Sequence, residues 1–349
     1  MEEKIMNTSN VRWGIAGLGN IAQRFAVALT QHCDHGELYA VAARSIDRAD
    51  TFRTTFGAEK GYGSYQELAE DPDVDAIYIA TVHPYHRALT ELFLRHGKHV
   101  LVEKPAFTNL ADWLAMKTLA HAQGLLLLEA MKTVTFPAYL ELKRYLKEHA
   151  LQVTKIDVAF GNHHNYDPDL FIFNSALAGG ATLDVGVYGL WLYFDLCDCL
   201  GVEPAEPLFT AVAELNECQV DTRSQFQLQG AIQGTIHTSI VEDLPRSATL
   251  CGEDFTVVIA EKWWNPAHIE IHRLGKVTSL FSPPEGNGFE FEIDHFSELV
   301  LQSKLDSELI PQRITEQVLT TVERALTHAG FAHLTRCNEQ ENKHEKPQT

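Results

Sequence analysis

The 349-residue sequence predicts two joined domains: an N-terminal α/β domain with a doubly wound parallel sheet, and a C-terminal α+β domain with a large, mostly antiparallel sheet. Three observations predict this architecture. A glycine-rich turn follows the first apolar run, and apolar strands then alternate with helical patterns up to about residue 130. Beyond that point, polar and apolar residues alternate with the two-residue period of half-buried strands. We expect the domains to span residues 10–133 and 134–335, with the functional site in the cleft between them.

The glycine-rich turn is the most specific local signal. The apolar run that begins at Val11 ends in Gly17-Leu-Gly19-Asn20-Ile21-Ala22, which matches the G-x-G-x-x-G/A pattern. Gly17 permits the tight turn, Gly19 lets a pyrophosphate approach the backbone, and the following helix offers its unpaired N–H groups to the phosphates. Because a strand precedes this motif and an apolar helix follows it, the motif predicts a dinucleotide-binding domain of the Rossmann type rather than a plain structural turn.

The other elements of the first domain follow in order. Strands are expected at residues 38–43, 76–82, 99–102 and 125–128, with helices at 47–56, at 85–96 and from 109 to 124. Asn109 can begin the last helix as its cap, and Gly124 can end it. Nearly continuous apolar strands joined by helical crossovers predict a parallel sheet that is covered on both faces.

The second domain reads differently. A helix is expected at residues 137–147, a strand at 153–160, and a buried helix at 183–200 after the Gly179-Gly180 break. Strand-like alternation then runs from 209 to 259, and helices near 288–302 and 312–328 complete the chain. We expect residues 1–9 and 338–349 to be flexible tails, because they are polar and charged.

Composition narrows the function classes. A formal net charge of −19 argues against a nucleic-acid partner, since phosphate binding needs a basic surface. No apolar run approaches the ~18 residues that a membrane span needs, and the polar first ten residues hold no signal-peptide core. We therefore expect a cytoplasmic protein that binds neither nucleic acid nor membrane.

Cofactor choice depends on the end of the second strand. NAD enzymes place an acidic residue there for the ribose 2′-hydroxyl, whereas a nearby arginine accommodates the 2′-phosphate of NADP. Here the position carries Arg44-Ser45, with Arg48 one turn further on. Asp47 is the counter-evidence, but it stands where it could cap the helix. The residues favour NADP over NAD.

Two further segments carry chemistry. Glu103-Lys104-Pro105 stands at the carboxyl end of the fourth strand, where ligands bind in such sheets, and an ammonium there could stabilise a developing alkoxide. A surface lysine before a turn proline is the plainer alternative. Asp184 and Tyr188, four residues apart in Gly179-Gly-Ala-Thr-Leu-Asp-Val-Gly-Val-Tyr188, share a helical face and suit acid–base work. Their plainer alternative is a helix-cap acid beside a packed aromatic ring.

Together, these three motifs resemble the glucose–fructose oxidoreductase / inositol dehydrogenase (Gfo/Idh/MocA) family over about residues 11–330. Four strings resemble its dimeric dihydrodiol dehydrogenase branch most: Val41-Ala-Ala-Arg-Ser45, Tyr62-Gly-Ser-Tyr65, Glu129-Ala-Met131 and Asp184-Val-Gly-Val-Tyr188. The resemblance implies that Lys104 is the catalytic lysine and that Asp184 and Tyr188 form the acid–base pair. With an ordinary pKa of about 10, Tyr188 would need the Lys104 charge nearby to act as a base near neutral pH.

The resemblance also implies where the cofactor binds. The loop Thr81-Val-His83-Pro84-Tyr85-His86 corresponds to the family's contact with the ribose and nicotinamide. We expect no metal there, because H-x-x-H is followed by no further ligand at suitable spacing. The expected cofactor-binding residues are Gly17, Gly19, Asn20, Ile21, Arg44, Ser45, Arg48, Tyr65, Thr81, His83, His86, Glu103 and Lys104.

One departure from the branch bears on the substrate. Where the branch carries E-A-[MI]-W-T-R, this chain has Glu129-Ala-Met-Lys132-Thr-Val134, so an aromatic side chain and an arginine are absent. The expected function is NADP-dependent hydride transfer between nicotinamide and a secondary alcohol or carbonyl of a sugar, polyol or vicinal diol. The alternative is a non-catalytic dinucleotide-sensing regulator on the same fold. The resemblance further implies a homo-oligomer, a dimer in the branch that it resembles most, formed through the open face of the C-terminal sheet.

Overall fold

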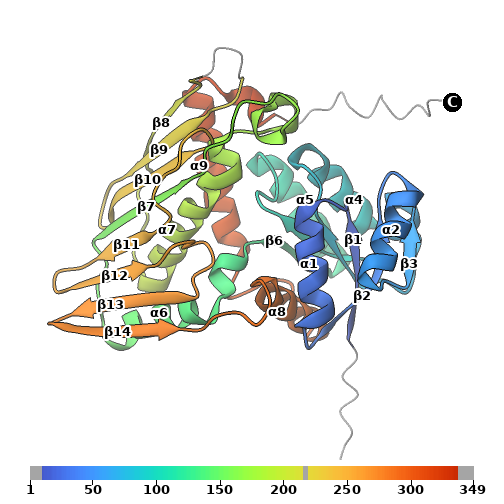
Figure 1. The fold of residues 1–349 in the computed structure, drawn as a ribbon, viewed down its shortest axis with the longest axis horizontal. Coiled ribbons are helices and arrows are strands. Elements are labelled where there is room, and N and C mark those ends of the chain that lie inside the picture. Colours follow the sequence, from blue (N-terminus) through green and yellow to red (C-terminus); the bar gives the residue numbers. More distant parts are fainter. Residues whose placement is uncertain (1–9, 215–218, 337–349) are drawn as a thin grey trace, which may run out of the picture.

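The computed structural model describes residues 10–214 and 219–336, which form two bodies side by side (Figure 1). The N-terminal body surrounds one sheet, and the C-terminal body lays helices against one face of a second, larger sheet. The segments expected to be flexible tails, 1–9 and 338–349, lie outside the described residues. Both predicted sheet types are therefore present, and the fold class is confirmed.

The N-terminal sheet is parallel, with strand order β3-β2-β1-β4-β5-β6. Its strands are β1 (Val11–Ala16), β2 (Gly36–Ala42), β3 (Lys60–Tyr62), β4 (Ala76–Ile79), β5 (His99–Glu103) and β6 (Leu127–Ala130). The helices are α1 (Asn20–Gln31), α2 (Ile46–Phe56), α3 (Tyr65–Glu70), α4 (His86–Arg95) and α5 (Leu110–Gln123). Successive strands are added on one side of β1 up to β3 and on its other side from β4 onward. This switch places a crevice at the carboxyl ends of β1 and β4. Strand β3 and helix α3 were not predicted, because both are too short to show a period.

The C-terminal sheet has strand order β14-β13-β12-β11-β7-β10-β9-β8, and all of its pairs are antiparallel except β7 with β10. Its strands are β7 (Lys155–Gly161), β8 (Leu208–Val212), β9 (Arg223–Leu228), β10 (Gln233–Ser239), β11 (Ala248–Cys251), β12 (Phe255–Ile259), β13 (His268–Arg273) and β14 (Lys276–Phe281). The prediction that strands stop near residue 259 was wrong. Strands β13 and β14 carry charged and polar side chains between their apolar residues, which weakens the pattern of alternation.

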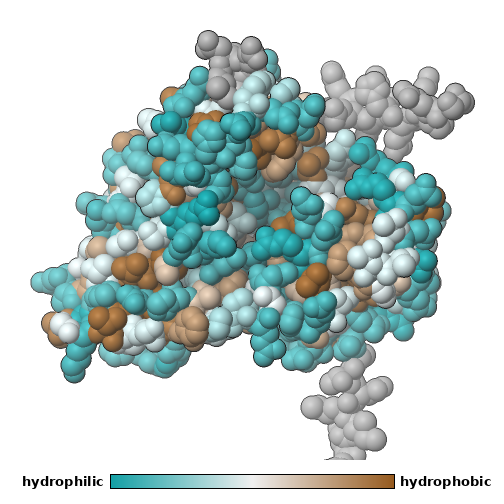
Figure 2. All heavy atoms as spheres, in the orientation of Figure 1, coloured by the Kyte–Doolittle hydropathy of each residue, from teal (hydrophilic) through white to brown (hydrophobic). Residues whose placement is uncertain are grey.

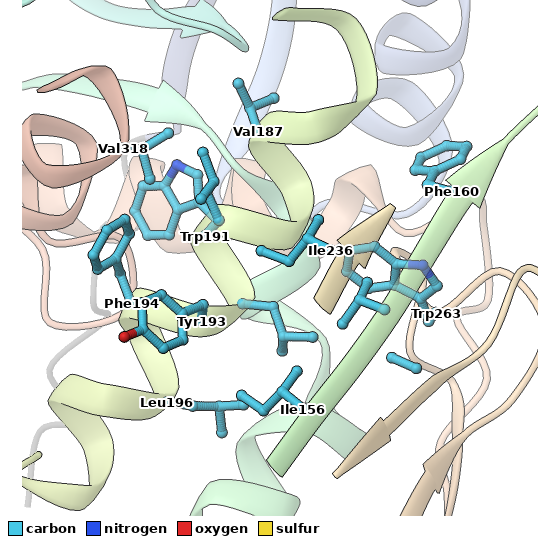
Figure 3. Close-up of a cluster of buried hydrophobic side chains, with 14 of the residues drawn as sticks. Ile156, Phe160, Val187, Trp191, Tyr193, Phe194, Leu196, Ile236, Trp263 and Val318 are labelled. Carbon is cyan, nitrogen blue, oxygen red and sulfur yellow. The ribbon is translucent and has the colours of Figure 1, made fainter. Parts of the chain in front are cut away.

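Helix α7 (Val187–Leu200) forms the centre of the C-terminal core. Apolar residues lie on all of its sides, as expected for a helix packed between a sheet and other helices. In Figure 3, Val187 and Trp191 of α7 gather with Ile156 and Phe160 of β7, all in one buried cluster. Helices α6 (Pro137–Glu148) and α9 (Gln312–His328) pack beside α7 on the same face of the sheet.

Helix α8 (Phe289–Leu301) returns from the C-terminal body to the N-terminal one and packs against α1. Its Phe289 and Phe296 belong to the core cluster of β1, and Ser297 accepts a hydrogen bond from the Trp13 indole at 3.0 Å. Helix α8, which follows the C-terminal sheet along the chain, therefore forms part of the core of the N-terminal body.

The predicted helix over 183–200 begins with a π-helical turn at Thr182–Gly186, ahead of α7. The Val187 amide closes this turn by donating to the Thr182 carbonyl, five residues back. Single π turns of this kind are often found at functional sites. This one carries Asp184.

Candidate active site

A cavity of about 630 Å³ lies at the carboxyl ends of the parallel strands, where the surface is hollowed between the two bodies (Figure 2). The glycine turn and the start of α1 line one end of it, and Asp184 and Tyr188 line the other. Most of the predicted site residues meet in this one cavity: Gly17, Gly19, Asn20, Ile21, Arg44, Arg48, Tyr65, Thr81, His83, Glu103, Lys104, Asp184 and Tyr188.

The glycine turn fits an anionic ligand. Gly17 has φ +92°, and a Cβ there would lie 2.7 Å from the Thr81 side chain, so this position requires glycine. A Cβ at Gly19 would meet no atom within 4 Å, which leaves space beside the backbone. Gly19 is also the N-cap of α1, with no side-chain cap and no acidic residue in the first turn. A helix N-terminus with free N–H groups therefore faces the cavity and suits a pyrophosphate.

Two guanidinium groups stand further along the same wall. Arg44 and Arg48 line the cavity beside Tyr65. Burial raises the pKa of the Tyr65 phenol, and the nearby charges of Arg44 and Arg48 partly oppose this. An Arg48 nitrogen also donates to the Leu18 carbonyl at 3.3 Å, which draws the guanidinium toward the glycine turn.

The cap of helix α2 differs from the prediction. Ser45, rather than Asp47, is the N-cap, and its hydroxyl accepts from the Arg48 amide at 3.5 Å. The serine immediately precedes the helix, whereas Asp47 lies within its first turn, where it can only favour the helix dipole. Ser45 is not among the residues that line the cavity.

At the other end of the cavity, a lysine meets the π turn. Lys104 Nζ donates to the Asp184 carbonyl oxygen at 2.6 Å and to its carboxylate Oδ1 at 3.2 Å. The same ammonium lies 4.9 Å from the centroid of the Tyr188 ring. The Lys104 side chain is 14% exposed and that of Asp184 22%, so the pair is shielded yet reachable from the cavity.

Electrostatics set the protonation of this group. Burial lowers the pKa of Lys104, but Tyr188, Asp184 and Glu103 together outweigh it, so the pKa is raised and the lysine is charged. Burial raises the pKa of Tyr188 to about 12, and the opposing charge of Lys104 does not offset it. The Lys104 charge that a base role for Tyr188 would need does lie nearby, but by itself it does not bring the pKa of the phenol below its ordinary value. Burial and the carboxylates of Glu103 and Asp184 keep the phenol protonated.

The loop after β4 separates its two histidines. His83 lines the cavity, and its Nδ1 lies 2.9 Å from the Ala178 carbonyl oxygen. His86 is fully buried behind the cavity, with Nε2 3.0 Å from the Thr81 carbonyl and Nδ1 3.1 Å from those of Pro105 and Ala106. His86 thus joins this loop to the Glu103-Lys104-Pro105 turn, in which the Lys104–Pro105 peptide bond is cis. Within residues 10–214 and 219–336, no group of three or more His, Cys, Asp or Glu side chains is placed to hold a metal.

The segment that departs from the branch is buried. Glu129 accepts hydrogen bonds from the Ala106 amide, the Trp191 indole and the Thr315 hydroxyl, so it joins the turn after β5 to α7 and α9. Lys132 is 7% exposed, and its ammonium lies 4.6 Å from the Phe289 ring centroid. Burial lowers the pKa of Lys132 to about 8.

Sequence reasoning missed six residues that line the cavity: Leu18, Arg24, Ala80, Val82, Tyr85 and Phe171. Leu18, Val82 and Tyr85 stand inside motifs that the sequence analysis quotes, and Ala80 directly precedes one of them. These four could have been identified from the motifs. Phe171 comes from a loop of the second body, and no spacing in the sequence indicates that this loop returns to the cleft.

The fold and the cavity fit an oxidoreductase that uses a nicotinamide dinucleotide. The model of an oxidoreductase family with an NAD-binding Rossmann fold matches residues 11–131. A trans-1,2-dihydrobenzene-1,2-diol dehydrogenase from Xenopus tropicalis is 31% identical over 333 residues, which cover 92% of this chain and 99% of that protein. The chain belongs to the Gfo/Idh/MocA oxidoreductase family.

Solved structures share the fold. A 3-ketoreductase from Actinomadura kijaniata, in complex with TDP-benzene and NADP, matches with a TM-score of 0.77 at 22% identity, covering 91% of this chain and 98% of that one. A levoglucosan dehydrogenase in complex with NADH and levoglucosan matches with a TM-score of 0.80 at 15% identity, covering 92% and 98%. In the described part of the chain, no helix combines the length and apolar character that a bilayer crossing requires.

Proposed function

We propose that this enzyme is NADP-dependent and transfers a hydride between the nicotinamide and a secondary alcohol or carbonyl of a sugar, polyol or vicinal diol. The observation that carries the proposal is the grouping of Lys104, Asp184 and Tyr188 at the far end of a cavity that begins at a glycine turn. A protein that only senses a dinucleotide needs no charged lysine against a buried phenol at that end.

The cavity residues fit the cofactor. The backbone of Gly17 and Gly19 and the start of α1 would hold the pyrophosphate, and Arg44 and Arg48 would hold the 2′-phosphate. Thr81 and His83 would lie toward the ribose and nicotinamide, as in the family. When bound, NADP supplies the nicotinamide carbon that accepts or gives the hydride.

The side chains at the far end manage the proton and the charge. In the reducing direction, the neutral Tyr188 phenol donates its proton to the carbonyl oxygen, which becomes the hydroxyl of the product. The Lys104 ammonium stabilises the negative charge that develops on that oxygen. Asp184 holds the ammonium through its carbonyl and carboxylate oxygens, so the lysine stays aimed at the cavity. Oxidation follows the same steps in reverse.

The substrate class is drawn from the names of the relatives. The Xenopus relative is named for a dihydrobenzene diol, and structural neighbours are named for a ketone reduction and for levoglucosan. Each of these names points to a hydroxyl or carbonyl carbon. Lys132 and Val134 are buried and do not line the cavity, so their departure from the branch does not separate an aromatic diol from a sugar or polyol.

The test is turnover of a panel of sugars, polyols and diols by the wild type, Lys104→Met and Tyr188→Phe, followed by nicotinamide absorbance. Each variant should lose at least about 100-fold in kcat while NADPH affinity stays within about twofold, since general acid–base groups contribute about 10²–10⁴. Lys117→Met and Tyr166→Phe are matched controls away from the cavity, and both should behave as the wild type. Normal turnover in both site variants would refute the assignment.

A non-catalytic regulator remains the alternative function. This alternative predicts that the wild type binds NADPH tightly but turns over no member of the panel. It also predicts that Tyr188→Phe binds NADPH as the wild type does.

We also propose self-association through the open face of the eight-stranded sheet. On its two edge strands, Leu208 and Val212 of β8 and Val277 and Phe281 of β14 are exposed, whereas the alternating Phe209 and Leu280 pack against the core. A dimer mass in solution that becomes a monomer mass in Val212→Glu with Phe281→Glu would support this, and an unchanged mass would contradict it.

A further inference from the structure

Asp221 is a buried carboxylate outside the cavity that the proposed chemistry does not use. It lies two residues before β9 and is fully shielded from solvent. Its Oδ2 accepts from the Thr182 amide at 2.8 Å and from the Thr182 hydroxyl at 2.6 Å. Its backbone carbonyl accepts from the Ala181 amide at 2.7 Å. One aspartate thus binds two successive residues at the start of the π turn.

The glycine pair before that turn is held on two sides. Gly180 has φ +111°, and a Cβ there would lie 2.3 Å from Asp221 Oδ1. A Cβ at Gly179 would lie 2.4 Å from the Phe171 carbonyl oxygen, and the Gly180 amide donates to the Ile172 carbonyl at 2.9 Å. The two glycines therefore let the chain pass between the 171–172 segment and the Asp221 carboxylate at contact distance. No side chain larger than hydrogen fits at either position without a shift.

A short covalent and hydrogen-bonded path leads from this contact to the site. The Asp184 amide donates to the Gly180 carbonyl at 3.0 Å, and the Val187 amide donates to the Thr182 carbonyl. Lys104 Nζ in turn binds the Asp184 backbone carbonyl at 2.6 Å. Because that contact is to the backbone, any movement of the π turn moves the oxygen that positions the ammonium.

We propose that Asp221 is a positioning residue: its carboxylate fixes the start of the π turn through Thr182 and thereby sets the placement of Asp184 and Tyr188 against Lys104. Its effect on turnover rests on the proposed function, whereas its effect on the geometry of Tyr188 does not. The ionised carboxylate accepts two charge-assisted hydrogen bonds on one oxygen, which are stronger than neutral ones. Among the described residues, Asp221 Oδ1 has no hydrogen-bond partner, so the carboxylate binds the chain through the Thr182 contacts of Oδ2.

The surroundings of Asp221 make this contact sensitive to pH. Burial raises its pKa to about 7, and the hydrogen bonds from Thr182 and its own amide oppose the shift. The charged groups near Asp221 have other partners. Arg223 pairs with Glu214 and Glu242 at the surface, and His333 contacts the Gln219 carbonyl. Protonation of Asp221 below about pH 7 removes the charge that strengthens both Thr182 hydrogen bonds.

The experiment compares the wild type with Asp221→Asn and Thr182→Val. Asp195→Asn is the control, because Asp195 is also buried in this domain but binds Tyr139 and Lys143 instead. Both site variants should lose about 10- to 100-fold in kcat, since small misplacements near reacting groups can cost that much. NADPH affinity should stay within twofold. The wild-type kcat should fall with an apparent pKa near 7 as the medium is acidified, and Asp221→Asn should lack that limb.

A readout independent of turnover separates this inference from the proposed function. With a carbon-13 label in tyrosine rings, and the Tyr188 signal assigned by Tyr188→Phe, that signal should shift between pH 6 and pH 8 in the wild type and in Asp195→Asn, but not in Asp221→Asn. If the wild type turns over no substrate yet the Tyr188 signal behaves this way, the proposed function fails and the positioning role stands. If the pH response of the Tyr188 signal is the same in Asp221→Asn as in the wild type, the positioning role is overturned.

Discussion

Removing Arg44 and Arg48 should convert a preference for NADPH into indifference between the two dinucleotides. Both guanidiniums line the wall beside Tyr65; Arg44 lies between β2 and α2, Arg48 lies in the first turn of α2, and both residues are exposed to solvent. A charge-assisted hydrogen bond contributes about 1.5–3 kcal/mol, and exposure to water argues for the lower end. At about 1.5 kcal/mol each, one substitution costs roughly 10-fold and both together roughly 100-fold. NADH lacks the 2′-phosphate, so its affinity should change by less than about threefold.

The assay is a titration of Arg44→Ala, Arg48→Ala and the double variant with NADPH and with NADH, followed by nicotinamide fluorescence. Arg53→Ala is the matched control, because Arg53 lies on the same helix, pairs with Asp50 at 3.2 Å and does not line the cavity. Arg53→Ala should bind both dinucleotides as the wild type does. Equal losses for NADPH and NADH, or no loss for either, would show that these arginines do not read the 2′-phosphate.

Two further predictions concern other parts of the site. Gly19→Val should weaken binding of both dinucleotides by about 100-fold, because the valine side chain would fill the space for a pyrophosphate. Its Tm should change little, because the φ of −87° at Gly19 suits any residue and a Cβ there would meet no atom within 4 Å. Titration and thermal unfolding check this prediction, and a large loss of Tm would contradict it. For Asp221, the folded-state pKa of about 7 exceeds the ordinary 3.8, so the folded state holds the proton more tightly. Its contribution to the free energy of unfolding is present below about pH 4 and lost as the pH rises through about 7, by roughly 4 kcal/mol. Denaturant unfolding at pH 5 and pH 8 should show about 2.5 kcal/mol of this fall in the wild type relative to Asp221→Asn, because pH 5 lies about two units below the folded-state pKa. Parallel pH dependences would refute it.

The sequence predicted the site well where a motif fixes backbone and side chain together. Position 17 requires glycine because its φ is positive and a Cβ there would lie too close to the Thr81 side chain. A pattern of glycines in the sequence indicates such backbone constraints directly. Lys104 could be placed because it directly follows a buried parallel strand, and the carboxyl ends of parallel strands lie at one edge of the sheet. The prediction of an Asp184–Tyr188 face was sound in position, although the turn is π-helical and the phenol is protonated.

The sequence could not predict what depends on contacts between distant segments. Phe171 reaches the cavity, and Asp221 reaches Thr182, from loops whose own residues show no periodicity. The sequence also could not show that burial by the surrounding elements outweighs the Lys104 charge in setting the pKa of Tyr188. Strands β13 and β14 lie at one edge of the sheet, and much of β14 is exposed to solvent. Polar residues therefore interrupt the apolar alternation there.

The measurement that tests the central claim most directly is transfer of deuterium from C4-labelled NADPH to a ketose or diketone by the wild type. If the enzyme reduces a secondary carbonyl, the deuterium should appear on the carbinol carbon of the product, and Tyr188→Phe should slow its appearance by at least about 100-fold. Tight binding of labelled NADPH with no deuterium in any carbonyl compound of the panel would contradict the account and favour a dinucleotide-sensing protein.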